Sequence, residues 1–267
     1  MAEVKQKKTE LLFQADTYLS SASSVRVVSC RRLAVDSQKS VLILEKTIFY
    51  PQGGGQPSDT GTIVAAGSGE TSSPKMVVTM VRTIPESGQV EHEGNIEGDE
   101  LFQENSLVDL AIDSQKRLLH ARIHTGGHLL DHAAQILHLP IVGTKGYHFP
   151  AGPYVEYSAA TPEVDVAAPA LAQMRRLLEE KTQQLIADGR AVTVEMVKPD
   201  QLPLDLKATL PAKALQSEHV RLVAVDGTPA PLPCGGTHVA STREIGLLTI
   251  KKLSAKGGVL RVSYVIA

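Results

Sequence analysis

The segment RIHTGGHLLDHAAQIL, residues 122–137, constrains the fold more than any other part of this chain. Apolar residues recur from Ile123 to Leu137 at helical spacing, which predicts a helix with one buried face. Gly126 and Gly127 interrupt its first half, between two histidines, although each glycine costs about 1 kcal/mol relative to alanine inside a helix. Because a glycine lets other groups approach the backbone closely, we expect a substrate or another segment to lie against this turn.

Histidines recur at every fourth position here: His120, His124, His128 and His132. A step of four residues rotates about 40° around a helix, so neighbouring histidines can share one ion, whereas the outer two differ by about 120° and cannot. Spacing alone leaves three candidate pairs. The glycines favour His124 and His128, because no comparable opening flanks the other pairs.

A second ligand pair lies far along the chain, in the motif LPCGGTHVASTREIG. Cys234 and His238 stand at C-x3-H spacing, and zinc prefers thiolate and imidazole ligands. Cysteine alone is more often a small buried apolar residue, but the proline, glycines and threonine around Cys234 indicate a loop. The two pairs together predict a zinc site with four ligands.

The composition is that of an ordinary globular chain, with 267 residues, 42% hydrophobic and 21% charged. No run approaches the roughly 20 apolar residues of a membrane helix, and the N-terminal residues lack the features of a signal peptide, so we expect a cytoplasmic protein. Two cysteines make no disulfide framework. The net charge of -2 means that any nucleic acid would bind through a local patch.

Two domains are expected, residues 1–115 and 116–267, because the periodicity changes near Asp113. The first contains β-rich runs separated by turns such as residues 67–74, which is typical of a small antiparallel barrel or sandwich. The second is predicted to be α+β, with two helices packed on a sheet. Its helices are expected at 113–139 and 169–190, with Gly189 as a C-cap, and its strands at 191–197, 220–227, 247–253 and 259–266.

The motifs HTGGHLL and CGGTHVASTREIG, with the earlier FYPQGGGQPSDTG, resemble the editing domain of alanyl-tRNA synthetases and of the free-standing AlaX editing proteins. The resemblance covers nearly the whole chain after the first twenty or so residues. It implies a small N-terminal β-barrel-like domain, followed by a helix-and-antiparallel-sheet editing domain of the threonyl/alanyl-tRNA synthetase additional-domain type. Related threonyl-tRNA synthetases share the histidine and cysteine motifs, but the glycine-rich motif favours the alanine branch.

The resemblance implies a deacylase that hydrolyses the ester between a wrong amino acid and tRNA(Ala). Serine is the chief candidate and glycine the second, and no aminoacylation is expected because the ATP-binding core is missing. A pocket built for alanine rejects such competitors only roughly 10 to 200-fold, so a second hydrolytic site is needed. That site can spare alanine by offering polar groups that only serine satisfies.

Further residues are candidates for substrate contact and catalysis from their chemistry and their place in the sequence. Thr144 is the candidate reader of the serine hydroxyl, and Gln56, Lys145 and His148 are candidates to align water, Gln56 and His148 as catalytic residues. Room for substrate is expected at Gly126 and Gly127, and the loop carrying Gly53, Gly54 and Gly55 is expected to approach the acceptor end. The densest basic region suggests tRNA backbone contacts at Arg243, Lys251, Lys252, Lys256 and Arg261.

Several alternatives stay open at this point. The chain could be a non-catalytic tRNA-binding module with structural zinc, a zinc hydrolase of small esters, or an editor of another mischarged tRNA such as seryl-tRNA(Thr). Four ligands held at once would let zinc position substrate, whereas a labile ligand would let it activate water. A monomer is favoured.

Overall fold

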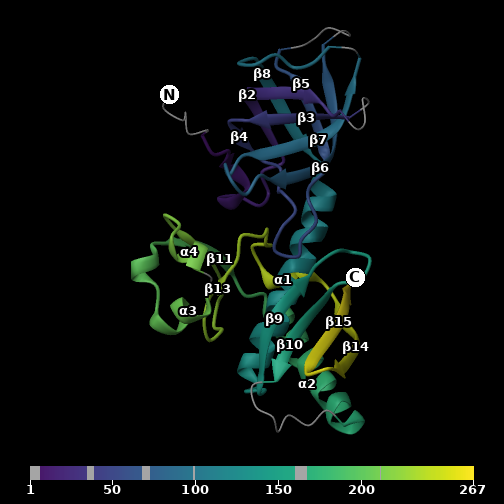
Figure 1. Ribbon diagram of the computed structural model, residues 1–267. Coiled ribbons are helices and arrows are strands. Elements are labelled where there is room, and N and C mark those ends of the chain that lie inside the picture. Colours follow the sequence, from purple (N-terminus) through teal and green to yellow (C-terminus); the bar gives the residue numbers. More distant parts are fainter. Residues whose placement is uncertain (1–6, 35–38, 68–72, 99, 160–166, 211) are drawn as a thin grey trace. The chain divides into compact units, whose positions relative to one another are not determined.

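The computed structural model describes residues 7–34, 39–67, 73–98, 100–159, 167–210 and 212–267 (Figure 1). The chain divides into two compact units, residues 1–119 and 120–267. The division expected from the sequence falls at the start of helix α1 (Ser114–Ile136), which carries the histidines. Residues 1–6, and residues 68–72 of the expected turn, lie outside the described residues. No helix in the described ranges is long and apolar enough to cross a membrane.

Six strands of the first unit form a closed antiparallel barrel in the order β2-β3-β7-β6-β5-β8. The barrel strands are β2 (Ser21–Arg32), β3 (Lys39–Leu44), β5 (Gly61–Ala65), β6 (Lys75–Thr83), β7 (Val90–Glu97) and β8 (Leu107–Ile112). Two short strands, β1 (Glu10–Leu11) and β4 (Lys46–Thr47), pair beside it, and the 3-10 helix η1 spans Leu12–Gln14. The sequence left a barrel and a sandwich as alternatives, and the structure has the barrel.

The barrel has one apolar interior because its strands alternate between buried and exposed residues. The pattern is regular in β7, where Val90, His92, Gly94 and Ile96 point inward, and the inward residues of all six strands form one apolar core. At Gly61 and Gly94, a β-carbon would collide with the backbone of the neighbouring strand. Glycine at these positions therefore permits a close strand crossing.

The second unit contains two antiparallel sheets. The larger has the order β14-β15-β10-β9 (Figure 1). The smaller has the order β11-β12-β13. The strands are β9 (Ile141–Tyr147), β10 (Tyr154–Ala159), β11 (Val192–Val197), β12 (Val220–Val225), β13 (Leu232–Pro233), β14 (Leu248–Lys256) and β15 (Val259–Ile266). The helices after α1 are α2 (Ala168–Asp188), η2 (Pro199–Gln201), α3 (Leu204–Thr209), α4 (Ala212–Leu215) and η3 (Thr242–Ile245).

The α+β prediction is confirmed, and local signals account for several boundaries. Asp113 accepts the Lys116 backbone N–H at 3.0 Å and starts α1. Gly189 ends α2 in the left-handed conformation, at φ 66 and ψ 41, as the C-cap prediction required. Gly257 and Gly258, at φ 57 and 79, form the two-residue turn between β14 and β15.

One face of the larger sheet packs on α1. Tyr264 of β15 donates its hydroxyl proton to the carbonyl of Ile123 at 2.9 Å, and Gly126 lies against Leu248 of β14. The strands β9 and β10, which were not predicted from the sequence, bring the segment around His148 to the same helix. This packing positions the histidine turn of α1.

Candidate metal centre

The two glycines of α1 are explained by side chains of the protein. A β-carbon at Gly126 would lie 3.1 Å from Leu248, and one at Gly127 would lie 2.5 Å from the His148 ring and 3.1 Å from the Tyr264 hydroxyl. The larger sheet and His148 therefore occupy the space beside this turn. Substrate contact with the two glycines stays a prediction.

The loop at residues 234–238 carries the second ligand pair and is held by Arg221 of β12. The Arg221 guanidinium, which is 7% exposed, donates through Nη1 to the carbonyls of Cys234 at 2.8 Å and Gly236 at 2.9 Å. A β-carbon on Gly236 would overlap the His124 ring. One buried arginine and one glycine thus bring the loop against α1.

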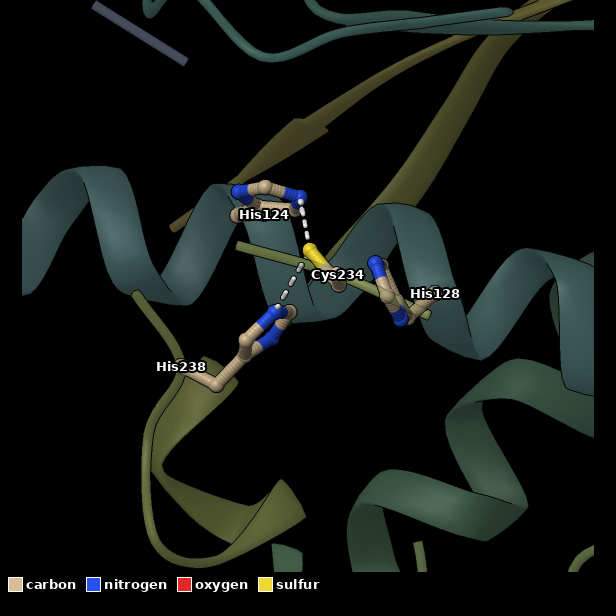
Figure 2. A group of neighbouring side chains, drawn as sticks. All are labelled: His124, His128, Cys234 and His238. Carbon is tan, nitrogen blue, oxygen red and sulfur yellow. Dashed lines mark hydrogen bonds between the residues drawn. The ribbon is translucent and has the colours of Figure 1, made fainter. Parts of the chain in front are cut away.

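His124, His128, Cys234 and His238 converge on one point (Figure 2). One donor atom from each residue lies within 4.8 Å of the other three, and Cys234 Sγ is 3.4 Å from His124 Nε2 and 3.3 Å from His238 Nε2. A tetrahedral zinc ion with usual bond lengths would place sulfur and nitrogen ligands roughly 3.5 Å apart. The four residues, called the metal cluster below, therefore suit a small ion with nitrogen and sulfur ligands.

Burial keeps the imidazoles of the metal cluster neutral. Burial first, and then the neighbouring histidines, lower the pKa of His124 and His238 well below 6.5, and that of His128 falls to about 3. Burial raises the pKa of the Cys234 thiol, while the Arg221 charge opposes that rise. A cation would favour the thiolate and would bind the free lone pairs of the imidazoles.

Thr125 fixes the orientation of His238. Its hydroxyl donates to the Ala121 carbonyl at 2.8 Å, so it can only accept from His238 Nδ1, which is 3.1 Å away. His238 therefore carries its proton on Nδ1 and presents the lone pair of Nε2 to Cys234. Such outer partners commonly orient a metal-binding histidine, and no sequence signal marked Thr125 as one of them.

His148 adjoins the metal cluster. Its ring stacks on His124, with centroids 4.2 Å apart and planes inclined by 20°, and burial lowers its pKa to about 4. Because the Tyr264 hydroxyl donates to Ile123, it accepts from His148 Nδ1 at 3.0 Å, leaving an unprotonated Nε2. His148 was predicted from the sequence as a site residue, whereas Tyr264 was not.

Two further histidines and one aspartate of α1 lie outside the metal cluster. His120 and His132 are 7% and 0% exposed, and burial lowers the pKa of His132 to about 4. The Asp131 side chain lies next to Gly143 of β9, and desolvation raises its pKa to about 7. Of the three histidine pairs that spacing allowed, the structure joins His124 and His128 to Cys234 and His238.

The glycine-rich motif forms a compact loop of the first unit. Gly53 and Gln56 exchange two backbone hydrogen bonds of 2.8 and 3.2 Å, and Gly54 and Gly55 have φ of 53 and 76, which favours glycine. The Gln56 side chain is fully buried. Roles for Gln56, Gly53, Gly54 and Gly55 in catalysis or substrate binding stay predictions.

The remaining predicted site residues are exposed. Thr144 is the extra residue of a bulge in β9, and its hydroxyl donates to the Glu156 carbonyl at 3.1 Å. Arg243 donates to the Ala187 carbonyl at the end of α2, at 3.1 Å. The exposed lysines are Lys145 on β9 and Lys251, Lys252 and Lys256 on β14.

Known proteins resemble both units of this chain. The family model of tRNA synthetases class II (A) matches residues 3–116, and that of the threonyl and alanyl tRNA synthetase second additional domain matches residues 220–262. The alanyl-tRNA editing protein AlaX-M of Methanosarcina mazei is 28% identical over 96% of this chain and 95% of its own. Over nearly its whole length, this chain is similar to AlaX-type alanyl-tRNA editing proteins.

Two longer relatives place the family match in context. AlaX-L of Pyrococcus horikoshii is 28% identical over 92% of this chain, which spans 55% of that protein. The alanine–tRNA ligase of Streptococcus thermophilus is 32% identical over 91% of this chain, which spans 26% of the ligase. The AlaX resemblance predicted from the three motifs is therefore confirmed, and the second-additional-domain match includes Cys234 and His238.

Proposed function

We propose that this protein is a deacylase that removes serine, and also glycine, from mischarged tRNA(Ala). The observation that carries the proposal is the metal cluster of an AlaX-type chain, in which four donor atoms lie within 4.8 Å of one another. In the reaction, water adds to the ester carbonyl carbon and the ribose oxygen leaves with a proton. The products are the free amino acid and uncharged tRNA.

Zinc is the proposed cofactor, because three imidazoles and one thiolate form a donor set that zinc prefers. His124, His128, Cys234 and His238 would hold it. When bound, zinc supplies a positive charge that attracts an oxygen or the amine of the substrate. The neutral state of the buried imidazoles supports this assignment, because only an unprotonated ring nitrogen can bind a metal.

Separate tasks are proposed for His148, for Thr144 and for the exposed basic residues. His148, whose Nε2 carries no proton, accepts a hydrogen bond from water and orients it. Thr144 forms a hydrogen bond with the serine hydroxyl. Because alanine lacks that hydroxyl, seryl-tRNA makes one more hydrogen bond at the site than alanyl-tRNA does. The acceptor end of tRNA(Ala) is the proposed partner of the exposed basic residues, of which the lysines are Lys251, Lys252 and Lys256.

Release of labelled amino acid from seryl-, glycyl- and alanyl-tRNA(Ala) tests the proposal. We expect rapid serine release, slower glycine release and intact alanyl-tRNA. Cys234→Ala should reduce serine release by at least about 100-fold. Loss of a residue that only supports a metal ligand typically reduces metal affinity or activity by about 10 to 100-fold, and Cys234 is itself a proposed ligand. Cys30→Ala is the matched control, because Cys30 packs beside the barrel core.

The outcomes separate the alternative functions. Removal of the metal with a chelator should abolish release, and added zinc should restore it. No release from any of the three tRNAs at one bound zinc per chain would contradict the deacylase and leave a tRNA-binding module. Release from seryl-tRNA(Thr) alone would contradict the choice of tRNA(Ala).

A further inference from the structure

A row of stacked aromatic rings lies on the face of the larger sheet that points away from α1. Tyr147 stacks on Phe149, with centroids 4.6 Å apart and planes inclined by 14°, and on Tyr154 at 5.1 Å and 17°. The Arg261 guanidinium covers the Tyr154 ring at 4.2 Å, and Lys145 Nζ lies 5.8 Å from the same ring. The three rings are called the aromatic stack below.

The strand register places cations around the aromatic stack. The pairing aligns Lys252, Ser263, Tyr154 and Tyr147 in one row across the sheet, and Ser254, Arg261, Glu156 and Lys145 in the next. A third row begins with Lys256 opposite Val259. Residues of one row share a face of the sheet, so these three rows carry four cations and one carboxylate, that of Glu156.

Glu156 sets the position of one cation. Its Oε1 accepts from Arg261 Nε at 2.9 Å and from Nη2 at 2.6 Å, and these contacts hold the guanidinium over Tyr154. The Arg261 side chain is 49% exposed and that of Glu156 is 15% exposed. The cation is therefore available to a ligand from solvent, whereas the carboxylate is largely covered.

One end of the aromatic stack is connected to the metal cluster through a neighbouring residue in the sequence. Phe149 directly follows His148, whose ring stacks on His124. Alternation along the chain sends His148 to the α1 side and its two neighbours to the opposite face. Arg261 covers the other end of the aromatic stack.

We propose that this face binds the unpaired 3′ end of an RNA, with bases stacked at the Phe149 end and phosphates near Lys145, Arg261 and Lys252. Aromatic side chains flanked by cations are the usual means of holding single-stranded nucleic acid, whereas a duplex keeps its base faces covered. The inference rests on the proposed function, since it supplies the surface that leads an acceptor end to the metal cluster.

Fluorescence anisotropy with a labelled eight-nucleotide RNA ending in CCA tests the surface without any hydrolysis. Phe149→Leu should weaken binding at least about fivefold, because stacking contributes about 1 to 3 kcal/mol per base. Lys145→Gln should weaken binding and reduce the slope of log K against log salt by about 0.7. Glu156→Gln should tighten binding, because it removes the only carboxylate of the three rows.

Controls separate binding from folding. Lys75→Gln removes an exposed lysine of the barrel that also lies beside a glutamate, at 3.0 Å, and should leave RNA affinity unchanged. The urea midpoint of each variant shows that the fold is retained. A merely structural aromatic stack would not produce opposite changes in affinity for Lys145→Gln and Glu156→Gln.

The outcomes also distinguish this surface from the proposed function. Unchanged affinity in Phe149→Leu and Lys145→Gln would overturn the surface, whatever the enzyme hydrolyses. Hydrolysis of seryl-tRNA(Ala) by a protein that does not bind the RNA probe would overturn the surface and leave the deacylase. Binding with the expected variant effects but no amino-acid release would support the surface and contradict the deacylase.

Discussion

The loop at residues 234–238 can pack against α1 only because a glycine lies at the contact point. Gly235 and Gly236 are neighbours in that loop, yet a β-carbon on Gly236 would overlap the His124 ring, whereas one on Gly235 would meet nothing within 4 Å. Neither residue has a positive φ, so alanine suits the backbone at both. The two positions differ only in what surrounds them.

This difference gives a matched pair of variants. Gly236→Ala should displace His124 from the metal cluster and weaken zinc binding by about 10 to 100-fold, a typical cost of disturbing a ligand's support. Gly235→Ala should leave zinc affinity unchanged. Competition with a chelating fluorescent indicator measures both, and equal affinities for the two variants would contradict the contact between Gly236 and His124.

Single residues were predictable where their chemistry is intrinsic. The glycines between His124 and His128 pointed to the pair that the structure groups with Cys234 and His238, because close approach leaves a local mark in the sequence. The partners Thr125, Arg221 and Tyr264 left no such mark, because hydroxyls and arginines are common on any surface. Their contacts join positions up to 141 residues apart, which spacing cannot reveal.

Elements of the first unit are joined by one buried ion pair. Arg117, in the first turns of α1, donates through Nε to both carboxylate oxygens of Asp59, at 3.0 and 3.1 Å, and through Nη2 to Oδ2. Its other donors reach the Ile48 and Thr17 carbonyls at 2.6 and 2.9 Å. Asp59 also accepts the Tyr50 N–H at 2.6 Å, so the pair connects the glycine-rich loop with the helix.

Loss of one partner should destabilise the first unit strongly. Arg117→Met leaves the Asp59 carboxylate buried without its counter-ion and should lower the free energy of unfolding by about 3 to 5 kcal/mol. A second change, Asp59→Asn, should recover part of that loss, because it removes the charge and keeps an acceptor for Tyr50. Urea unfolding measures all variants.

The control for this prediction is Arg176→Met, which breaks an exposed pair on α2 whose side chains are 62% and 59% exposed. Exposed pairs contribute about 0 to 1 kcal/mol, so its unfolding free energy should hardly change. A similarly small loss in Arg117→Met would contradict the joining role of the pair.

Helices and strands were predictable where the local pattern of apolar residues is strong. The two long helices, α1 and α2, and the last two strands, β14 and β15, were predicted because the apolar spacing of their residues marks them. The strands β9 and β10 escaped prediction because β9 is mostly exposed and is bulged at Thr144. The separation of the second unit's strands into two sheets depends on long-range pairing, which period-two alternation does not encode.

At the scale of the whole molecule, the stability of the fold depends on pH through a buried histidine of the barrel. His92 is 0% exposed. Its Nδ1 donates to the Leu42 carbonyl at 3.0 Å, and its Nε2 accepts from the Thr47 hydroxyl at 2.8 Å. Burial lowers its pKa from 6.5 to about 4, so the folded chain holds this ring neutral.

The sign of the pH dependence follows. Between pH 6.5 and about 4 the unfolded chain binds a proton at His92 and the folded chain does not, so stability falls as the pH falls. From pH 7 to pH 5 this histidine should reduce the free energy of unfolding by about 2 kcal/mol. Urea unfolding of the unchanged protein and of His92→Gln at the two pH values measures this change. The free energy of unfolding should change less with pH in the variant, by that amount. An identical change in both proteins would contradict the role given to His92.

The metal cluster joins two ligand pairs that lie far apart in the chain, and that distance sets an order of events during protein synthesis. His124 and Cys234 are 110 positions apart, so the ribosome takes roughly 5 to 20 seconds to make the second pair after the first. Every barrel strand is complete by Ile112, before either pair has been made. A chain released before residue 234 would therefore keep all the strands of its barrel and lack half of the metal cluster.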